Sequence, residues 1–415
     1  MIKNSSSKWI VITCLVVAGE MIFSLPFHVA RYFRPTVLDV FNLSNAALGD
    51  IFAVYGITAM LAYYPGGAIA DRFSARKLMT VSLIATAIGG LYMAQIPSRT
   101  ELNFLFAYWG ITSILLFWAA LIRATRDWGG SSVQGSAFGL LDGGRGLIAA
   151  TVATVGVFFF SQVLPTDFEA VTVLQRKHAL QAVIYYYTFM TITAGVLVWF
   201  FIPNTDNNVS VKEPVANLRL VLSQSVVWLQ GAIVICAYCG YKGLDNYGLY
   251  AVEVLGMNEV DSARFTSIAA YLRPVAAIAA GFLVDRTSAS KVIRITFIFL
   301  LVSYSFLAFS TPSLLITNII YTNLIITFVG VFAIRGVYFA LLEETNISKN
   351  ITGTAVGLIS VIGFTPDVFF AAITGRLLDN APGIEGHQHF FMLLVVISLI
   401  GMVATLVLAH NKKLI

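Results

Sequence analysis

The chain has 415 residues, of which 58% are hydrophobic and only 11% are charged, and its mean hydropathy is +0.82. Soluble globular domains are about half apolar and about a quarter charged, so this composition excludes a soluble fold and indicates a helical protein that crosses a membrane several times. The formal charge of +5 comes from basic residues in short segments between apolar runs, which is typical of membrane topology and excludes a nucleic-acid-binding surface.

Apolar runs of about 20 residues predict membrane-spanning helices. The first run follows Lys3 and Lys8 and carries Glu20, so we expect an uncleaved span rather than a signal peptide. The expected fold is an all-α integral membrane protein with twelve transmembrane helices in two pseudo-symmetric six-helix halves. The expected spans are 9–31, 46–70, 77–96, 102–124, 136–163, 179–202, 221–250, 263–284, 290–309, 313–341, 352–377 and 388–410.

The longest polar stretch, IPNTDNNVSVKEPVANLR, follows the sixth span and predicts a linker. We therefore expect a six-helix bundle over 1–202, a cytoplasmic linker over 203–219 and a second bundle over 220–415. With the N-terminus inside, the cytoplasmic segments hold about 15 of the 26 Lys and Arg residues, which predicts that both termini are cytoplasmic.

One short motif occurs twice. Gly67, Asp71 and Arg72 follow the second span, and Gly281, Asp285 and Arg286 follow the eighth. The same pattern at the same place in each half indicates two related six-helix units, which is typical of transporters whose halves rock around a central site.

With Arg76, the first copy reads Gly-x-x-x-Asp-Arg-x-x-x-Arg, which resembles the signature loop of the major facilitator superfamily. The resemblance covers the whole chain and implies that family's fold and alternating access. It also implies a cytoplasmic gate in which Asp71 holds the halves together, as a carboxylate near a helix end and a pair of bases would. The alternative is that these charges only set topology. The gate residues are Gly67, Asp71, Arg72, Arg76, Asp285 and Arg286.

A narrower resemblance is to the organophosphate/phosphate antiporter branch. It rests on RATRDWGGSSVQGSAFGLLDGGRG (123–146), YCGYKGLDNYGLY (238–250) and FHVARYF in the first span. That branch binds phosphate with one Arg from helix 1 and one from helix 7. Here Arg31 and His28 lie near the first position, while Gly240 falls at the second and Lys242 is the nearby base. These departures favour an organic anion over a phosphate ester.

Ionisable groups inside a span are costly and face a cavity or a partner. From these groups and nearby tyrosines, we expect substrate contacts from His28, Arg31, Tyr63, Arg145, Lys242, Tyr247 and Arg335. Proton coupling is expected from Glu20, Asp142 and Asp367.

Structural alternatives remain open for these charges. The i,i+3 pairs Asp142/Arg145 and Lys242/Asp245 share a helix face and could neutralise each other, and Glu20 could be satisfied by a nearby base. Arg273 and Asp367 each neighbour a proline, which breaks helices and exposes half-helix ends. For Arg273, an interhelical salt bridge is favoured.

The sequence contains no Gly-x-x-x-x-Gly-Lys-Ser/Thr, His-Glu-x-x-His or Gly-x-Ser-x-Gly motif, so we expect no enzyme activity. Cys14, Cys236 and Cys239 lie in apolar runs without the spacing of a metal site, and no metal or cofactor is expected.

The predicted function is secondary active transport of a small polar, anionic organic solute, coupled to protons or to exchange of a counter-anion. The expected setting is a bacterial inner membrane, with the chain a monomer in the bilayer. Two alternatives remain: a proton-antiport exporter of drugs or siderophore-like compounds, and a non-transporting membrane sensor.

Overall fold

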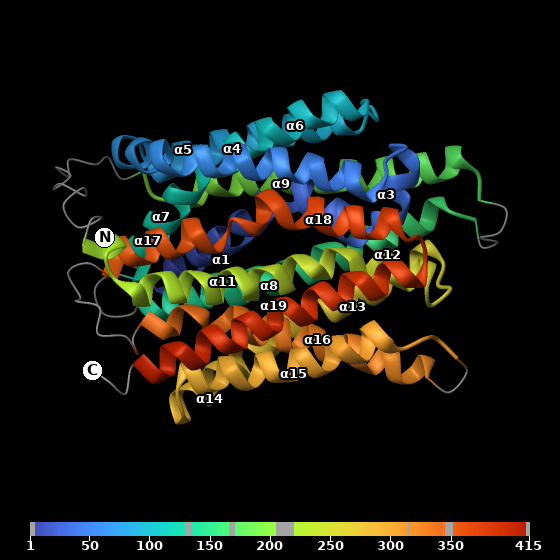
Figure 1. The fold of residues 1–415 in the computed structure, drawn as a ribbon. Helices are drawn as coiled ribbons and strands as arrows, with labels where there is room; N and C mark the ends of the chain where they lie inside the picture. Colours follow the sequence, from blue (N-terminus) through green and yellow to red (C-terminus); the bar gives the residue numbers. More distant parts are fainter. Residues whose placement is uncertain are drawn as a thin grey trace.

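A computed structural model describes residues 5–129, 134–165, 171–204, 220–313, 316–342, 344 and 352–411. All regular elements in these ranges are helices, packed side by side along one direction (Figure 1). This confirms the all-α class. The elements up to residue 204 are α1 (Ser5–Met21), η1 (Ser24–His28), α2 (Val29–Tyr32), α3 (Arg34–Val40), α4 (Asn45–Arg72), α5 (Ala75–Met93), α6 (Arg99–Ile111), η2 (Thr112–Trp118), α7 (Ala119–Gly129), α8 (Gln134–Val163) and α9 (Val173–Phe201).

The second part of the chain repeats this succession of long helices. It contains α11 (Ser225–Gly243), η4 (Leu244–Asn246), α12 (Tyr247–Glu253), α13 (Glu259–Ala269), α14 (Leu272–Arg286), α15 (Ala289–Phe309), α16 (Thr317–Val337), η5 (Tyr338–Leu342), α17 (Thr352–Gly363), α18 (Pro366–Asn380) and α19 (Ile384–Asn411). We call residues 1–202 the N-terminal half and residues 220–415 the C-terminal half. The expected linker lies almost entirely outside the described residues.

Ten of the described helices are long and apolar enough to cross a membrane, or eleven if the bent pair Lys8–Met21 and Ser24–Tyr32 is one span. The sequence predicted twelve. The difference falls on α5, which packs along α9 but begins with Arg76 and Lys77 and contains several Ser, Thr and Gly residues. These residues lower its mean hydropathy, and α5 is not among the helices apolar enough to count as a span.

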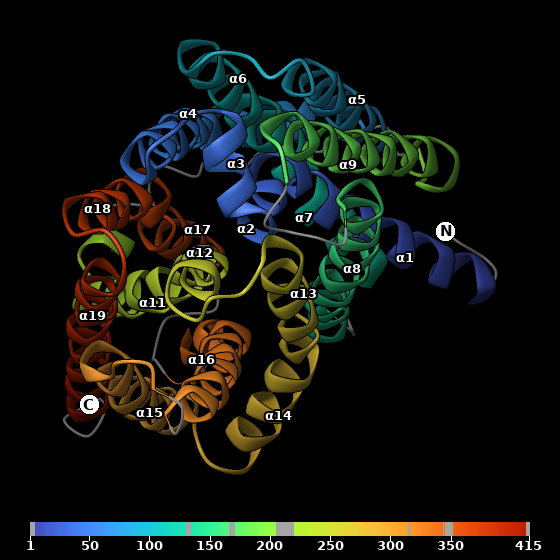
Figure 2. The same cartoon turned by 90° about the vertical axis from the view of Figure 1, so that its right-hand side faces the viewer.

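Two separate hydrophobic clusters form the core. One joins residues 11–202 with a few side chains of α13, and the other joins residues 221–408. Viewed along the helices, α5, α6 and α9 lie on one side of the bundle, and α14, α15 and α16 lie on the other (Figure 2). The interface between the halves therefore runs through the middle of the molecule.

The two halves share local structure at a constant spacing of 214 residues. Ser74 caps α5 by accepting the Lys77 amide at 3.4 Å, and Ser288 caps α15 by accepting the Lys291 amide at 3.3 Å. A serine at this position satisfies an amide that the first helical turn leaves unpaired. The repeated motif therefore produces the same N-terminal cap at the start of α5 and at the start of α15.

Both termini lie at one end of the bundle, on the left of Figure 1, and the opposite end carries α3 and α12. At that opposite end, α4 and α18 approach closely because both present glycine. A Cβ atom on Gly49 would collide with the Ala371 carbonyl oxygen, and one on Gly375 would collide with the Asn45 carbonyl oxygen. This end of the bundle is closed by backbone packed on backbone.

Polar contacts strengthen the same closure. The Asp379 carboxylate accepts the Asn45 and Ala46 amides at 3.0 and 2.7 Å, so a C-terminal-half carboxylate caps the start of α4. Arg376 contacts Asp50 at 2.9 Å across the same interface. The halves are therefore joined there by charge as well as by packing.

Candidate functional site

The first span is bent where it reaches the centre of the bundle. Pro26 has no amide hydrogen, and the chain passes from α1 through the π-turn η1 with a bend of 42°. The Ser24 hydroxyl donates to the Met21 carbonyl at 2.7 Å and satisfies an acceptor near the break. As a result, Glu20 and His28 face each other, with 3.2 Å between the Glu20 Oε1 and His28 Nε2 atoms.

Three further spans are interrupted at the same depth. α11 passes into the 3-10 turn η4 between Lys242 and Asp245, α13 ends before Arg273, and α18 begins at Pro366 beside Asp367. The expectation that the two prolines mark helix breaks is confirmed. Charged side chains at these breaks converge on the interface between the halves.

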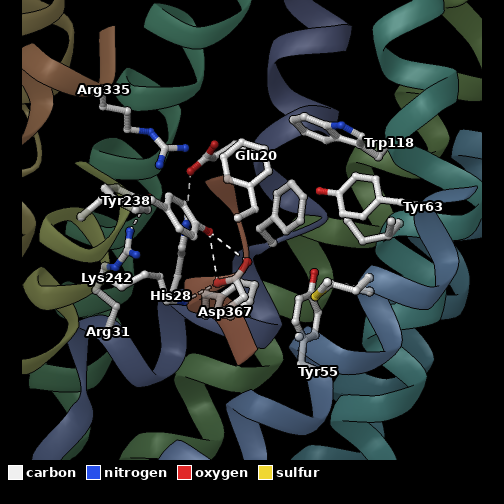
Figure 3. A pocket seen from close by; sticks show the side chains of 18 of the residues that line it. Glu20, His28, Arg31, Tyr55, Tyr63, Trp118, Tyr238, Lys242, Arg335 and Asp367 are labelled. Atoms are coloured by element: carbon white, nitrogen blue, oxygen red, sulfur yellow. Dashed lines mark hydrogen bonds and ion pairs between the residues drawn. The ribbon is translucent and has the colours of Figure 1, made fainter. Parts of the chain in front are cut away.

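A cavity of about 90 Å³ lies at this interface (Figure 3). Its walls are aromatic and charged, and both halves contribute to them. The charged and imidazole side chains that line it are Glu20, His28, Arg31, Arg145, Lys242, Arg335 and Asp367, and the aromatic ones are Phe23, Phe27, Tyr55, Tyr63, Trp118, Tyr238, Tyr241 and Phe364.

Glu20 is the centre of one ion cluster. Its carboxylate lies 3.0 Å from Arg145 Nε and 3.7 Å from Arg273 Nη1, and it is only 2% exposed. Arg273 also contacts Asp142 at 2.9 Å, so it ties the C-terminal half to α1 and α8 together. Gly146 gives it room, since a Cβ there would lie 2.9 Å from the Arg273 side chain.

Asp245 is the centre of a second cluster. It forms an ion pair with Arg31 of the other half and lies 3.6 Å from Lys242. Lys242 also contacts Asp367 at 3.2 Å, and the Tyr238 hydroxyl donates to both Asp367 oxygens at 3.0 and 3.1 Å. Each acid of this cluster is therefore held by at least one base.

Arg335 differs from the other bases. Its guanidinium carbon lies 3.8 Å from the centre of the Tyr241 ring, and Nε and Nη1 are buried without a hydrogen-bond partner in the described chain. None of the ion pairs of the described residues includes it. A buried guanidinium without a carboxylate is costly unless a ligand supplies the negative charge.

Nine charged side chains form what we call the central charge cluster. Five are basic and four are acidic, which leaves a surplus of one positive charge. The members are Arg31, Arg145, Lys242, Arg273 and Arg335 with Glu20, Asp142, Asp245 and Asp367. The unpaired member of this set is Arg335, so the surplus charge faces the cavity.

The structure brings together most residues expected to bind substrate. His28, Arg31, Tyr63, Arg145, Lys242 and Arg335 line the cavity, as do Glu20 and Asp367. Tyr247 does not line it, because its hydroxyl meets Thr327 at 2.8 Å inside the C-terminal core. Asp142 stands behind the cavity wall with Arg273.

Two expected pairings have different outcomes. Lys242 and Asp245 contact each other, which confirms the i,i+3 pair in the seventh span. The proposed pairing of Asp142 with Arg145 is wrong, because Arg145 turns to Glu20 on α1 and Asp142 to Arg273 on α14. The interhelical salt bridge expected for Arg273 is confirmed.

Sequence reasoning missed two tyrosines of the site. Tyr241 accepts a hydrogen bond from Arg31 at 2.6 Å and stacks under Arg335, and Tyr238 holds Asp367. A signal was present: Tyr238, Tyr241 and Asp245 are spaced three and four residues apart, so they lie on one face of the helix, and Lys242 is four residues after Tyr238.

The expected gate residues lie at the end of the bundle that holds the termini. Gly67, Asp71 and Arg72 are in the last turns of α4, and Asp285 and Arg286 end α14. Arg76, in the first turn of α5, stacks over Trp199 at 5.2 Å. Their role as a gate stays a prediction.

Among the described residues, no group of three or more His, Cys, Asp and Glu side chains is arranged to hold a metal ion.

Residues 10–365 match the model of the family described as Major Facilitator Superfamily. The chain belongs to the major facilitator superfamily. It is thus a multi-pass membrane protein of a transporter family, and the resemblance drawn from the loop motif is confirmed. As a member of the major facilitator superfamily, it positions its cavity where the two halves meet.

Two other membrane-transport or membrane proteins are similar to this chain in sequence. The chain is 30% identical over 409 residues to Inner membrane protein YqcE of Escherichia coli, covering 95% of this chain and 92% of that protein. It is 25% identical over 267 residues to the Probable nitrate/nitrite antiporter NarK1 of Thermus thermophilus, covering 62% and 57%.

A solved structure shows the same fold. The bacterial homologue of the human lysosomal transporter Spinster, in an inward-facing and unoccupied conformation, aligns with a TM-score of 0.74. The alignment covers 99% of this chain and 98% of that one at 14% identity. At this identity the similarity shows the major facilitator superfamily fold alone.

Proposed function

We propose that this chain is a secondary active transporter that moves a small polar organic anion by alternating access, driven by protons or by exchange of a counter-anion. The observation that carries the proposal is Arg335, the base of the central charge cluster that lacks an acidic partner and faces the cavity. A solute with one negative charge would complete the balance of this buried cluster.

The rest of the cavity supports a small polar solute. Guanidinium groups bind carboxylates through paired hydrogen bonds. The Tyr63 hydroxyl points toward the cavity for a further contact (Figure 3), while the Tyr55 hydroxyl is held by Ser113 at 2.6 Å. The name of the Thermus relative describes an antiporter of inorganic anions, which agrees with an anion as cargo here. Alternating access would open the end that Gly375 and Asp379 now close.

The proposed setting is the inner membrane, with both termini in the cytoplasm. The relative from Escherichia coli is named an inner membrane protein, and the basic residues concentrate in the segments at the end where the termini lie. With that orientation, the closed end faces outward.

The experiment is a thermal-shift screen of the purified chain against D-gluconate, L-lactate and nitrate, with choline and tetraphenylphosphonium as cations. A ligand at a hundredfold excess over its Kd stabilises the folded state by about 2.7 kcal/mol. We expect a shift with at least one anion, loss of that shift in Arg335→Gln, and partial recovery in Arg335→Lys.

The matched control is Arg264→Gln, since Arg264 is exposed and lies away from the cavity. It should respond to the anion as the wild-type chain does. Stabilisation by the cations alone would replace this proposal with the drug-exporter alternative, and an Arg335→Gln chain that still binds the anion would remove Arg335 from the site.

A further inference from the structure

The four acids of the central charge cluster are poorly suited to take up a proton. Glu20 contacts Arg145 and Arg273, and Asp142 also contacts Arg273. In the second cluster Asp245 and Asp367 share Lys242. Protonating Glu20 would leave Arg145, and protonating Asp245 would leave Arg31, buried without a counter-charge, which costs several kcal/mol inside a membrane protein. Asp142 does not line the cavity, and Asp367 already accepts hydrogen bonds from Tyr238 on both oxygens and contacts Lys242.

His28 differs because one ring nitrogen is in use and the other is not. Its Nε2 atom lies 3.2 Å from the Glu20 carboxylate, and a carboxylate accepts hydrogen bonds, so the neutral ring carries its hydrogen on Nε2. The lone pair is then on Nδ1, which is buried and has no hydrogen-bond partner in the described chain. A proton added at Nδ1 would break no hydrogen bond that the structure contains.

The surroundings of His28 make the added charge depend on a ligand. Of the charged neighbours, only Glu20 favours a positive ring, and Arg31 and Arg273 oppose it. The aromatic neighbours are uncharged, and α5 meets η1 through Gly90 against Leu25. The groups that face or surround the ring are Glu20 from α1, Arg31 and Tyr32 from α2, Arg145 from α8, Tyr187 from α9 and Arg273 from α14.

The anion and the proton would share one cavity, since His28 and Arg335 both line it. We propose that His28 takes up one proton at Nδ1 when the anion binds and releases it with the anion on the other side, so that the chain is a proton–anion symporter. This inference rests on the proposed function. The new N–H bond forms with a proton from water on the side of entry, and the same bond breaks on the side of exit.

Charge accounting supports a ratio of one proton to one monovalent anion. The empty cluster has a surplus of one positive charge, and adding one proton and one anion restores the same surplus. The empty and the loaded protein would then carry the same charge through the membrane, so neither has the larger electrostatic barrier to the conformational change.

The experiment uses the full-length chain in proteoliposomes that contain the pH dye pyranine, with labelled D-gluconate, L-lactate or nitrate as the probe. Uptake is measured once with an acidic exterior and once as exchange against the same unlabelled anion inside. We expect the wild-type chain to accumulate the anion under the gradient and to acidify the interior as it does so.

His28→Gln keeps an amide near the Nε2 position but has no basic nitrogen. We expect the ratio of gradient-driven accumulation to exchange to fall at least tenfold in this variant. The control is His178→Gln, an exposed histidine at the start of α9, which should keep the wild-type ratio.

The outcomes separate the two proposals. Wild-type exchange that neither responds to the gradient nor moves protons overturns the role of His28 and leaves the anion transporter intact, even if His28→Gln fails to fold. Full accumulation by His28→Gln also overturns it. A wild-type chain that takes up none of the three anions overturns the proposed function, and this inference with it.

Discussion

Arg31 and Asp245 occupy corresponding positions of the internal repeat and form an ion pair with each other across the two halves. They are 214 residues apart, as are the capping serines Ser74 and Ser288. Two positions related by a twofold rotation can touch only near the rotation axis. The ion pair therefore marks the pseudo-twofold axis of the molecule, beside the cavity.

Breaking this pair should destabilise the protein strongly. Asp245→Asn leaves Arg31 and Lys242 buried without their shared carboxylate, and removing one partner of a buried ion pair costs about 3–5 kcal/mol. The exposed pair of Arg264 with Asp261 offers the control, where Asp261→Asn should cost less than about 1 kcal/mol. Thermal unfolding of the purified variants measures both. A double exchange, Arg31→Asp with Asp245→Arg, should recover part of the lost stability. Equal unfolding temperatures for Asp245→Asn and the wild-type chain would show that the Arg31–Asp245 ion pair does not stabilise the protein.

Tyr241 should act on anion binding through its ring as well as its hydroxyl. Tyr241→Phe removes the hydrogen bond from Arg31 but keeps a ring under Arg335, while Tyr241→Leu removes both. A desolvated cation–π contact contributes about 1–2 kcal/mol, so the leucine variant should bind the anion about tenfold more weakly than the phenylalanine variant. Titration of the anion by thermal shift or calorimetry gives the two Kd values, and equal values would show that the ring does not position Arg335.

Residue type alone predicted most of the residues that form the site. It predicted few of the contacts between them. Pro274 and Pro366 predicted the breaks beside Arg273 and Asp367 because proline cannot continue the backbone hydrogen bonds of a helix. Asp142 and Arg145 stand on one helix face, yet each found a partner on another helix. Spacing along a helix brings side chains near each other, but tertiary neighbours decide which contact forms.

The tyrosines of the site illustrate the same limit. An aromatic residue in a membrane span packs against its neighbours more often than it binds a ligand, and Tyr247 does so. Tyr241 lies only six residues earlier, and its function depends on Arg31 and Arg335, which come from distant parts of the chain. The pairing of Arg31 with Asp245 could have been predicted from the sequence. It requires only the spacing of 214 residues between the two copies of the loop motif, which also separates these two residues.

Closure of the bundle at the end opposite the termini should be sensitive to a single methyl group. Gly49→Ala would place a carbon against the Ala371 backbone, so we expect α4 and α18 to separate and the open state to become more populated. Gly139→Ala is the control, because a Cβ there meets nothing within 4 Å. Spin labels on cysteines introduced at Thr100 and Arg264 would report the distance between the halves at this end. The three native cysteines are buried, so the label should react with the introduced ones. An unchanged distance distribution in Gly49→Ala would mean that the helices accommodate the methyl group without opening.

The two copies of the loop motif should differ in importance. Arg76 of the first copy corresponds to Ser290 in the second, so only the first copy has the second arginine of the motif. If Asp71 serves as a gate, Asp71→Asn should lower the initial transport rate about tenfold, and Asp285→Asn should lower it about twofold. Initial transport rates measured in proteoliposomes at matched protein content test this difference. Equal and small effects of the two substitutions would indicate that the motif serves membrane topology alone.

The chain enters and leaves each half at the end of the bundle that holds both termini (Figure 1). Each half therefore crosses the bundle an even number of times, so joining the halves in either order requires no additional span. A gene cut between the codons for residues 204 and 220 could supply the halves as two polypeptides, and a gene with the halves in reverse order could encode the same assembly. The order of the halves is thus a property of the gene, while the transporter requires only that both insert the same way round.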